Sequence, residues 1–475
     1  MSFNRVVAVL FTLLSLSYEC HSRTQARHPW RPDSEATDVD VIRRIDAIAD
    51  NALKAVPVAG MSVTVVRGSR TIISKGYGLA DVTRGIAATA ETQYRVGSIT
   101  KLITAVAVQK LIERGQLRLD DTLDQFFPEY QAVKGITIRQ LLNHTSAVPD
   151  YERDAVGRWM AHRLPISKEY IWSVVGRGRM TGVTGESWEY TSSNFYLLGL
   201  IIEKVSRQPY AVFVEREMLM PQGLKATVMC SGQPPAKGRA LDYIVEGNTL
   251  VQDTVWELPG IFSDGGMCST APELAFFVRA LTTARIISRK SLANMLRPTV
   301  LPSGVRADYG LGVRLGSLDG RRKWGHTGSG AKSNRSALAH YPDAGLTVVV
   351  LLNTEREDTP ISAIDVEAKI ARVVLGLSSI AVKDISLPKS APAYVGTYEQ
   401  KGGRWQVFVE RGRLRLKRLG SEASTTTMRY QDNNEVVPYP EYPDYRFVFQ
   451  LLGGRAIAFS SYDGGWFTGV RKRVE

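Results

Sequence analysis

Hydrophobic and polar positions near the start of the chain follow first a helical and then a strand period. Residues 38–55 carry apolar side chains at helical spacing, which is typical of an amphipathic helix. After a turn at residues 57–60, two runs rich in β-branched side chains follow at residues 61–67 and 71–77. The pattern therefore predicts that a helix and two strands open a folded domain.

The middle of the chain, residues 97–298, is mostly helical in pattern, and strand-like runs return after it. A helical middle between strands at both ends predicts one sheet built from the two ends and a separate helical lobe, an α/β (α+β) fold. The cleft between two such lobes is the natural position of a binding site. The predicted helices are residues 137–143, 193–206, 272–283 and 361–375, and the later strands are residues 309–315, 335–340 and 346–352.

The composition changes near residue 380. Residues 379–392 are rich in proline and small residues and are predicted to be a linker. Residues 393–475 then alternate in short β runs separated by glycine-containing turns, which predicts a small β-barrel or meander. Basic and apolar residues alternate at 411–418, and this pattern favours one solvated strand face over an anion-binding stripe.

The first residues have the order of an export signal. Arg5 precedes an apolar run at residues 6–16, and small residues follow near Cys20 and Ser22. The run is shorter than the roughly twenty apolar residues that span a bilayer. We therefore predict that residues 1–22 are a signal peptide cleaved after Ser22 and that the mature protein is periplasmic or secreted. Lipidation at Cys20 is the alternative, which the bulky polar residues before it disfavour.

Composition and charge narrow the class of protein. With 475 residues, 44% of them hydrophobic, the chain is not a disordered one. The net charge of +13 predicts attraction to an anionic cell envelope, although a generic basic surface is the commoner explanation. The sequence contains neither a nucleic-acid-binding motif nor a zinc-type or phosphate-loop motif, so no nucleic acid partner and no cofactor are predicted. Cys230 and Cys268 form either a disulfide or two buried thiols.

The pattern Ser-x-x-Lys occurs three times, and its surroundings distinguish the copies. The two side chains meet only on a helix, where residues three apart are neighbours. Pro388 disfavours a helix in the last copy, and no apolar period follows the middle one. Only the first copy opens a long apolar helix. The copies are Ser98 with Lys101, Ser329 with Lys332, and Ser386 with Lys389.

Ser98 and Lys101 fit two interpretations. In the chemical one, Ser98 is a nucleophile whose proton Lys101 takes, provided that burial or nearby positive charge keeps the lysine neutral. In the structural one, Ser98 caps the helix and Lys101 is solvated, and the pattern alone favours this. Two further stretches reverse that balance. "GESWEYTSSNFYLLG" at residues 185–199 puts a tyrosine just before a new helix, and "KWGHTGSG" at residues 323–330 is expected to put residues 326–328 after a strand and a glycine-rich turn.

Together with Ser98 and Lys101, these stretches resemble the three motifs of the serine β-lactamase and penicillin-recognising enzyme superfamily, nearest its class C, D-alanyl-D-alanine carboxypeptidase and esterase branch. The resemblance implies a β-lactamase/transpeptidase-like domain at residues 38–378, with an antiparallel sheet flanked by helices and an all-helical lobe. Residues 393–475 are similar, more weakly, to the lipocalin-like modules of some relatives. Supporting stretches are "TIRQLLNHTSAVPDY", "GGMCSTAPELAFF", "YGLGV" and "YPDAGLTVVVLLN".

The resemblance implies a role for each residue that matches a motif. Ser98 matches the acylated nucleophile, Lys101 its activator, and Tyr190 a general base that also protonates the leaving group. His326 matches a position where many relatives have lysine and some carboxypeptidases have histidine. Thr327 and Gly328 match the rest of that motif, and the resemblance implies that the backbone N–H of Ser329 pairs with that of Ser98 as an oxyanion hole.

The second motif departs from the pattern of the relatives. Ser192 stands where they usually have asparagine, and a short hydroxyl replaces an amide that both donates and accepts, which argues against efficient β-lactam hydrolysis. A different register pairs Ser192 with Asn194 and leaves Tyr190 without a match. His144, in a loop that resembles a fold-shaping family loop, is interpreted as structural.

The sequence therefore predicts an exported serine hydrolase that works through an acyl-enzyme on Ser98 and takes a small-molecule or peptide substrate. An amide ending in a D-residue is the first choice of acyl donor, a small ester the second, and a β-lactam the third. The alternative of another class is a non-catalytic binding or assembly protein. A cationic His326 that recognises a substrate carboxylate is a further hypothesis, because histidine titrates near neutral pH.

Overall fold

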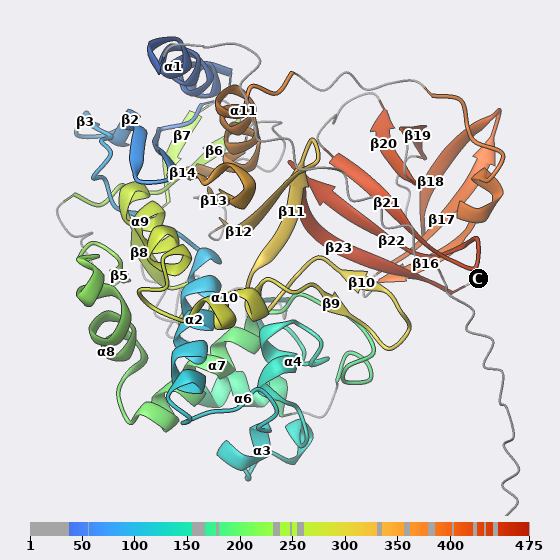
Figure 1. Ribbon diagram of the computed structural model, residues 1–475, viewed down its shortest axis with the longest axis horizontal. Helices are drawn as coiled ribbons and strands as arrows, with labels where there is room; N and C mark the ends of the chain where they lie inside the picture. Colours follow the sequence, from blue (N-terminus) through green and yellow to red (C-terminus); the bar gives the residue numbers. More distant parts are fainter. Residues whose placement is uncertain are drawn as a thin grey trace, which may run out of the picture.

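In a computed structural model of the protein, two strands near the start of the chain pair with strands from residues 314–352 in one antiparallel sheet (Figure 1). Val63 in the central strand β1 lies opposite Val350. The order across the sheet is β3 (Ile86–Ala87), β2 (Arg70–Asp81), β1 (Gly60–Arg67), β14 (Leu346–Leu352), β13 (Arg335–Tyr341), β12 (Arg321–Ser329) and β11 (Arg314–Leu318). The structure describes residues 38–55, 57–153, 167–176, 180–230, 238–247, 249–253, 261–329, 335–355, 362–378, 385–400, 403–420, 425–431, 434–439 and 445–474.

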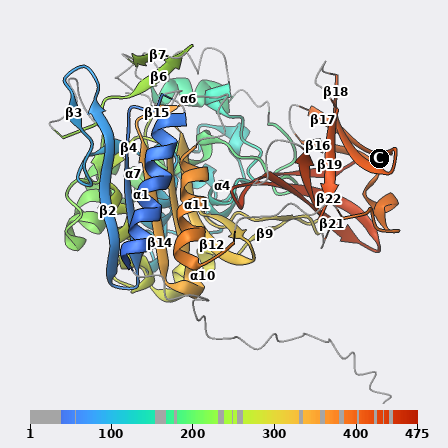
Figure 2. The same ribbon diagram turned by 90° about the horizontal axis from the view of Figure 1, so that it is seen from above.

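Helices cover both faces of this sheet. α1 (Asp38–Ala55) and α11 (Ala363–Leu375) lie side by side on one face, where their apolar stripes pack on Val350 and its neighbours (Figure 2). α2 (Ile99–Glu113) and α9 (Ala271–Thr282) cover the other face and share a second core with Val349. Adjacent strand residues thus face different cores, because side chains alternate along a strand.

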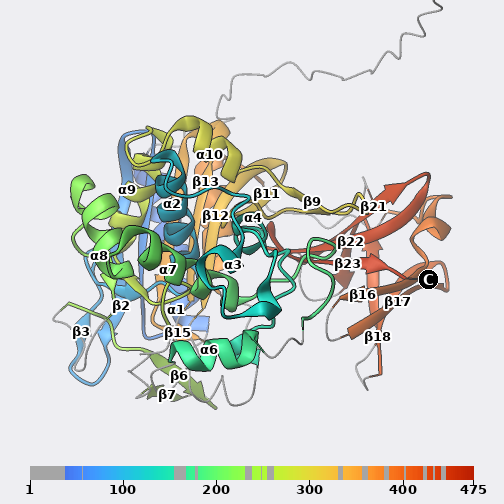
Figure 3. The same cartoon turned by 90° about the horizontal axis from the view of Figure 1, so that it is seen from below.

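α2 passes between the sheet and a lobe built from helices, and 12 of its 15 residues are buried. A helix that is apolar on all sides needs neighbours on all sides, and Figure 3 shows lobe helices gathered around it. α4 begins with a capping box in which Thr137 and Gln140 exchange hydrogen bonds. The other helices are α3 (Leu123–Phe126), α4 (Ile138–Leu142), α6 (Lys168–Val175), α7 (Ser192–Ser206), α8 (Tyr210–Val214) and α10 (Arg289–Met295).

Short strands complete the first domain. Cys230, which follows β5, forms a disulfide with Cys268 in β8, so the structure resolves the choice that the sequence left open. None of the helices in the described part of the chain is long and apolar enough to cross a membrane. The short strands are β4 (Tyr94–Arg95), β5 (Val228–Met229), β6 (Tyr243–Glu246), β7 (Thr249–Gln252), β8 (Met267–Ser269), β9 (Thr299–Val300), β10 (Arg306–Ala307) and β15 (Thr354–Glu355).

The last part of the chain forms an antiparallel eight-stranded barrel that closes by pairing its first and last strands. The last strand also pairs with the sheet of the first domain, where Trp466 lies opposite Gly316, so sheet and barrel are continuous. The barrel strands are β16 (Gly396–Gln400), β17 (Gly403–Glu410), β18 (Arg413–Leu419), β19 (Thr426–Tyr430), β20 (Glu435–Tyr439), β21 (Tyr445–Leu452), β22 (Arg455–Asp463) and β23 (Trp466–Arg473).

The α/β (α+β) fold with a helical lobe and a terminal barrel is confirmed. One local prediction is wrong: residues 326–328 lie inside strand β12 rather than after a strand and a turn, because β12 pairs with β13 as far as Ser329. The strand predicted at residues 309–315 begins later, at Arg314. The signal peptide at residues 1–22 and part of the linker, residues 379–384, lie outside the described residues. The likeness of the barrel to a lipocalin stays a prediction.

Candidate active site

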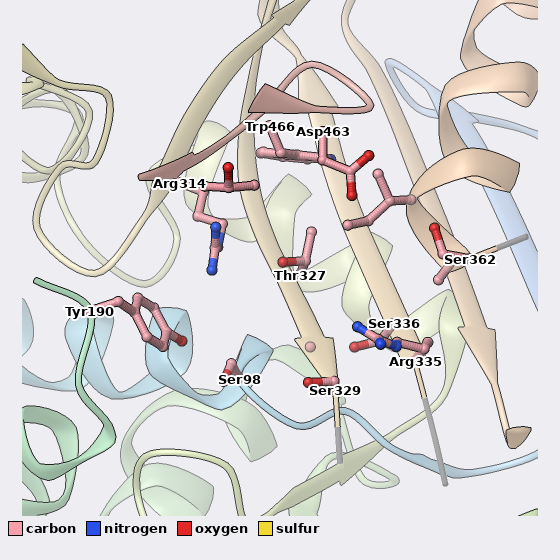
Figure 4. Close-up of a pocket in the computed structure, with 14 residues that line it drawn as sticks. Ser98, Tyr190, Arg314, Thr327, Ser329, Arg335, Ser336, Ser362, Asp463 and Trp466 are labelled. Carbon is pink, nitrogen blue, oxygen red and sulfur yellow. The ribbon is translucent and has the colours of Figure 1, made fainter. Parts of the chain in front are cut away.

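A cleft of about 260 Å³ lies where the start of α2, the end of β12 and a hairpin of the barrel meet (Figure 4). Ser98 lies at the bottom of this view, with Tyr190 on one side and Ser329 on the other. The cleft combines residues from distant parts of the sequence and from both domains. They are Ser98, Tyr190, Arg314, Thr327, Gly328, Ser329, Arg335, Ser336, Ser362, Ala363, Ile364, Asp463, Trp466 and Thr468.

Ser98 directly precedes helix α2 but does not cap it. Its backbone has helical angles and its side chain makes no capping hydrogen bond. Its Oγ instead accepts a hydrogen bond from Nζ of Lys101 at 3.0 Å. The interpretation of Ser98 as a helix cap beside a solvated lysine is therefore wrong, because Lys101 is 1% exposed.

Lys101 is held by three oxygen atoms. Besides Ser98, its Nζ donates to Oγ of Ser192 at 3.2 Å and to the backbone oxygen of Asp264 at 2.7 Å. Burial lowers the pKa of Lys101, but the electrostatic interactions with Tyr190, Asp264 and nearby Glu152 outweigh burial and raise the pKa above its ordinary value. The raised pKa favours the ammonium form of Lys101 over the neutral form that a lysine base requires.

Tyr190 presents its hydroxyl to this pair. Figure 4 shows the hydroxyl directed toward Ser98, and it is buried without a hydrogen-bond partner among the described residues. Two cations flank the ring: Nζ of Lys101 and the guanidinium carbon of Arg314 each lie 5.1 Å from its centroid. A buried polar atom that lacks a partner is costly, so the hydroxyl is poised to meet one.

Two glycines let the start of α2 approach the end of β12. A Cβ on Gly328 would lie 2.1 Å from the backbone oxygen of Val96, and one on Gly97 would lie 2.8 Å from the backbone oxygen of Ser329. Because no side chain separates the two segments, the backbones of Ser98 and Ser329 lie side by side at the floor of the cleft. This is the arrangement that two backbone donors need in order to bind one oxyanion.

The second motif follows the register that keeps Tyr190. Ser192 contacts Lys101, whereas Asn194 accepts a hydrogen bond from Ser146 at 2.6 Å and lies 3.2 Å from Nδ1 of His144, away from the cleft. His144 also accepts from the backbone N–H of Thr191 at 3.3 Å. His144 therefore fixes the segment that carries Tyr190.

His326 lies behind the cleft and does not line it. Its Nδ1 donates to the backbone oxygen of Thr327 at 2.6 Å, which leaves Nε2 to accept from the hydroxyl of Tyr309 at 3.1 Å. Burial, and then the charge of Arg314, hold the pKa of His326 well below its ordinary value. The hypothesis of a cationic His326 that binds a carboxylate is wrong, because the ring is buried and neutral.

Arg335 and Arg314 both line the cleft, and sequence reasoning missed them. Arg314 is the one that lies against the ring of Tyr190. It lies in β11, and one of its guanidinium nitrogens donates to the backbone oxygen of Phe467 in the barrel at 2.7 Å. Asp463 and Trp466, also from the barrel, were missed as well. Only tertiary structure brings these residues to Ser98, and no motif marks them.

Carboxyl groups surround the other side of Lys101. Oδ2 of Asp264 accepts from the hydroxyl of Tyr151 at 2.7 Å, and Oδ1 of Asp150 accepts from the backbone N–H of Ser192 at 3.2 Å. Burial raises the pKa of both aspartates, and it raises that of Glu152 to about 7 with the help of the two neighbouring carboxylates. Asp264 and Glu152 act on Lys101 through charge, whereas its direct contact with this group is the backbone oxygen of Asp264.

Comparison with known families agrees with this geometry. Residues 45–371 match the sequence model of the family described as Beta-lactamase. The chain therefore belongs to the beta-lactamase family. This agrees with the resemblance of its three motifs to those of the serine β-lactamase superfamily.

Individual relatives extend the comparison. Penicillin-binding protein 4* of Bacillus subtilis (strain 168) is 28% identical over 383 residues, which are 76% of this chain and 84% of that protein. An octameric penicillin-binding protein homologue from Pyrococcus abyssi has a TM-score of 0.64 at 21% identity and covers 91% of this chain and 100% of its own. A D-amino acid amidase from Ochrobactrum anthropi SV3 has a TM-score of 0.62 at 22% identity, and the match covers 70% of this chain and 98% of the amidase. At these identities, the two solved structures show likeness of fold.

Proposed function

We propose that the protein is a serine hydrolase that cleaves amide bonds through an acyl-enzyme on Ser98. The observation that carries the proposal is the contact between the hydroxyl of Ser98 and the buried ammonium of Lys101, with the unpartnered hydroxyl of Tyr190 beside them. A serine without such neighbours is a poor nucleophile. Membership of the beta-lactamase family supports the proposal.

Within this proposal, each residue of the site has a role in proton transfer or charge stabilisation. In the attack that we propose, the phenolate form of Tyr190 accepts the proton of Ser98 as Oγ bonds to the carbonyl carbon, and the amino group of Lys101 stays in contact with Oγ. The backbone N–H groups of Ser98 and Ser329 stabilise the oxyanion. Tyr190 then gives the proton to the leaving amine as the C–N bond breaks. Water takes the place of the amine and releases the acid by the same steps in reverse.

We take an amide with a terminal D-residue as the substrate class. Arg314 and Thr327 line the cleft above Ser98, where a cation and a hydroxyl are able to bind the carboxylate of the leaving residue. The name of the D-amino acid amidase of similar fold supports this choice. Small esters are the second choice. β-Lactams are the third, since Ser192 replaces the usual amide.

Export is part of the proposal. The disulfide between Cys230 and Cys268 supports it, because such bonds persist in oxidising compartments. N-terminal sequencing of the protein recovered from the cell exterior tests the predicted cleavage after Ser22. An intact N-terminus on the recovered protein contradicts it.

Active-site labelling tests the chemistry. A fluorophosphonate and a fluorescent penicillin should label the wild type, and Ser98→Ala should abolish labelling and hydrolysis without lowering the melting temperature. Ser386→Ala, which alters the second complete Ser-x-x-Lys copy in the described residues, is the matched control and should label normally. A fluorophosphonate adduct mapped to a serine other than Ser98 refutes the assignment. A wild type that binds penicillin but turns over no amide or ester favours the non-catalytic alternative.

A further inference from the structure

The turn between β22 and β23 of the barrel forms one end of the cleft. Asp463, Trp466 and Thr468 line it together with residues of the first domain. Figure 4 shows Asp463 and Trp466 at the end opposite Ser98, beyond Thr327, with Arg314 at the side. The barrel therefore contributes directly to the space that a substrate occupies.

A buried polar network fixes this turn on the first domain. Lys323 and Glu367 form an ion pair at 2.8 Å with both side chains 0% exposed. Glu367 also accepts from Nε1 of Trp466 at 3.2 Å, and Lys323 donates to the backbone oxygen of Gly464 at 2.7 Å. A buried charge that loses its partner is strongly unfavourable, so the turn is held in a single position.

Backbone contacts add to this rigidity. β23 pairs with β11 where Trp466 lies opposite Gly316, and a Cβ on Gly316 would lie 2.1 Å from the backbone oxygen of Gly465. The same strand holds Arg314 through the backbone oxygen of Phe467. The position of Asp463 relative to Arg314 is thus set by the fold and is not left to a free loop.

The charges along the cleft are ordered. Starting from Ser98, the lining passes Arg335 on the side of Ser329, then Thr327 and Arg314, and ends at the carboxylate of Asp463. A leaving residue whose carboxylate binds Arg314 points its side chain away from the bond that breaks. Because Ser98 and Asp463 line one cleft of about 260 Å³, a long side chain on that residue is directed toward the end wall.

We infer that Asp463 is a specificity-determining residue that binds a cationic side chain on the leaving D-residue. The inference rests on the proposed function, because it assumes that Arg314 holds the carboxylate of that residue. Its chemistry is a charge-assisted hydrogen bond from an ammonium to a carboxylate inside a walled cleft. The substrate class is then a peptide that ends in a basic D-residue such as D-lysine.

Matched substrates test the inference. Peptides with one acyl group and a terminal D-lysine, Nε-acetyl-D-lysine or D-norleucine are compared by kcat/KM. The wild type should prefer D-lysine about tenfold, the difference expected for one hydrogen bond to a charged group. Asp463→Asn should remove the preference and Asp463→Glu should retain it. Asp343→Asn, which removes an exposed aspartate paired with Arg322, is the matched control and should keep the preference.

The outcomes separate this inference from the proposed function. A wild type with equal kcat/KM for all three peptides overturns the inference, and so does a preference that survives in Asp463→Asn. If no peptide is turned over, calorimetric binding of N-acetyl-D-lysine and N-acetyl-D-norleucine gives the same comparison without catalysis. Ester hydrolysis and labelling of Ser98 report on the proposed function independently, and melting temperatures show that each variant is folded.

Discussion

Replacing Gly328 by alanine tests whether the approach of β12 to the start of α2 builds the oxyanion site. The new methyl group would lie 2.1 Å from the backbone oxygen of Val96 and 2.4 Å from Oγ of Ser336. An ordinary contact of this kind is about 3.3 Å, so the backbones of Ser98 and Ser329 have to separate by about 1 Å. A misplacement of this size costs about 100-fold in rate. We expect kcat/KM for a neutral ester to fall about 100-fold, with about 1–3 kcal/mol lost in stability.

The assay is the rate of hydrolysis of a p-nitrophenyl ester, together with the rate of Ser98 labelling and the melting temperature. Gly182→Ala is the matched control, because the nearest atom to its new Cβ is Oγ of Ser187 at 3.5 Å and its backbone has no positive φ. Hydrolysis and labelling by Gly328→Ala at the rates of this control would refute the reasoning, since the distance between the two segments would then not set the rate.

Three further predictions concern stability. The free energy of unfolding should fall as the pH drops below about 6.5, because the pKa of buried His144 and His326 is depressed and only the unfolded chain takes up protons on these residues. Denaturant unfolding at a series of pH values measures this, and the free energy should depend less steeply on pH in His326→Asn. Cys268→Ser should cost about 2–4 kcal/mol, measured by urea denaturation, and a reductant should change the wild type but not this variant. Glu367→Ala should cost about 3–5 kcal/mol by leaving the buried charge of Lys323 without the carboxylate of Glu367, whereas Lys323→Met with Glu367→Leu should recover most of the loss; equal losses would contradict this.

The regular elements were predictable where one period dominates. α1 has a single apolar stripe, and β14 is a run of apolar residues, so the residue ranges predicted from the sequence agree with those in the structure. The end of β12 was not predictable. Its glycines and polar residues favour a turn, and its pairing with β13 overrides this local preference. The start of β11 depends on pairing with β12 and was placed too early for the same reason.

The site was predictable only where a motif is local. Lys101 lies in the first turn of α2, three residues after Ser98, so their contact follows from spacing. The charge of Lys101 does not follow from spacing, because it depends on Asp264 and Glu152 from other segments of the chain. Arg314 and Asp463 carry no motif, and their place in the cleft arises from the pairing of β11 with β23.

The pairing of β23 with β11 also affects the order in which the site is completed during synthesis. β23 follows every other described strand and helix in the chain, whereas Ser98 is made before three quarters of it. Because synthesis proceeds from the N-terminus and domains fold as units, the nucleophile and its lysine are assembled while the end wall is still missing. A chain that stops before β23 contains Ser98 and Lys101 but lacks the end wall of the cleft, so the proposed selectivity for the leaving residue depends on the last strand to be made.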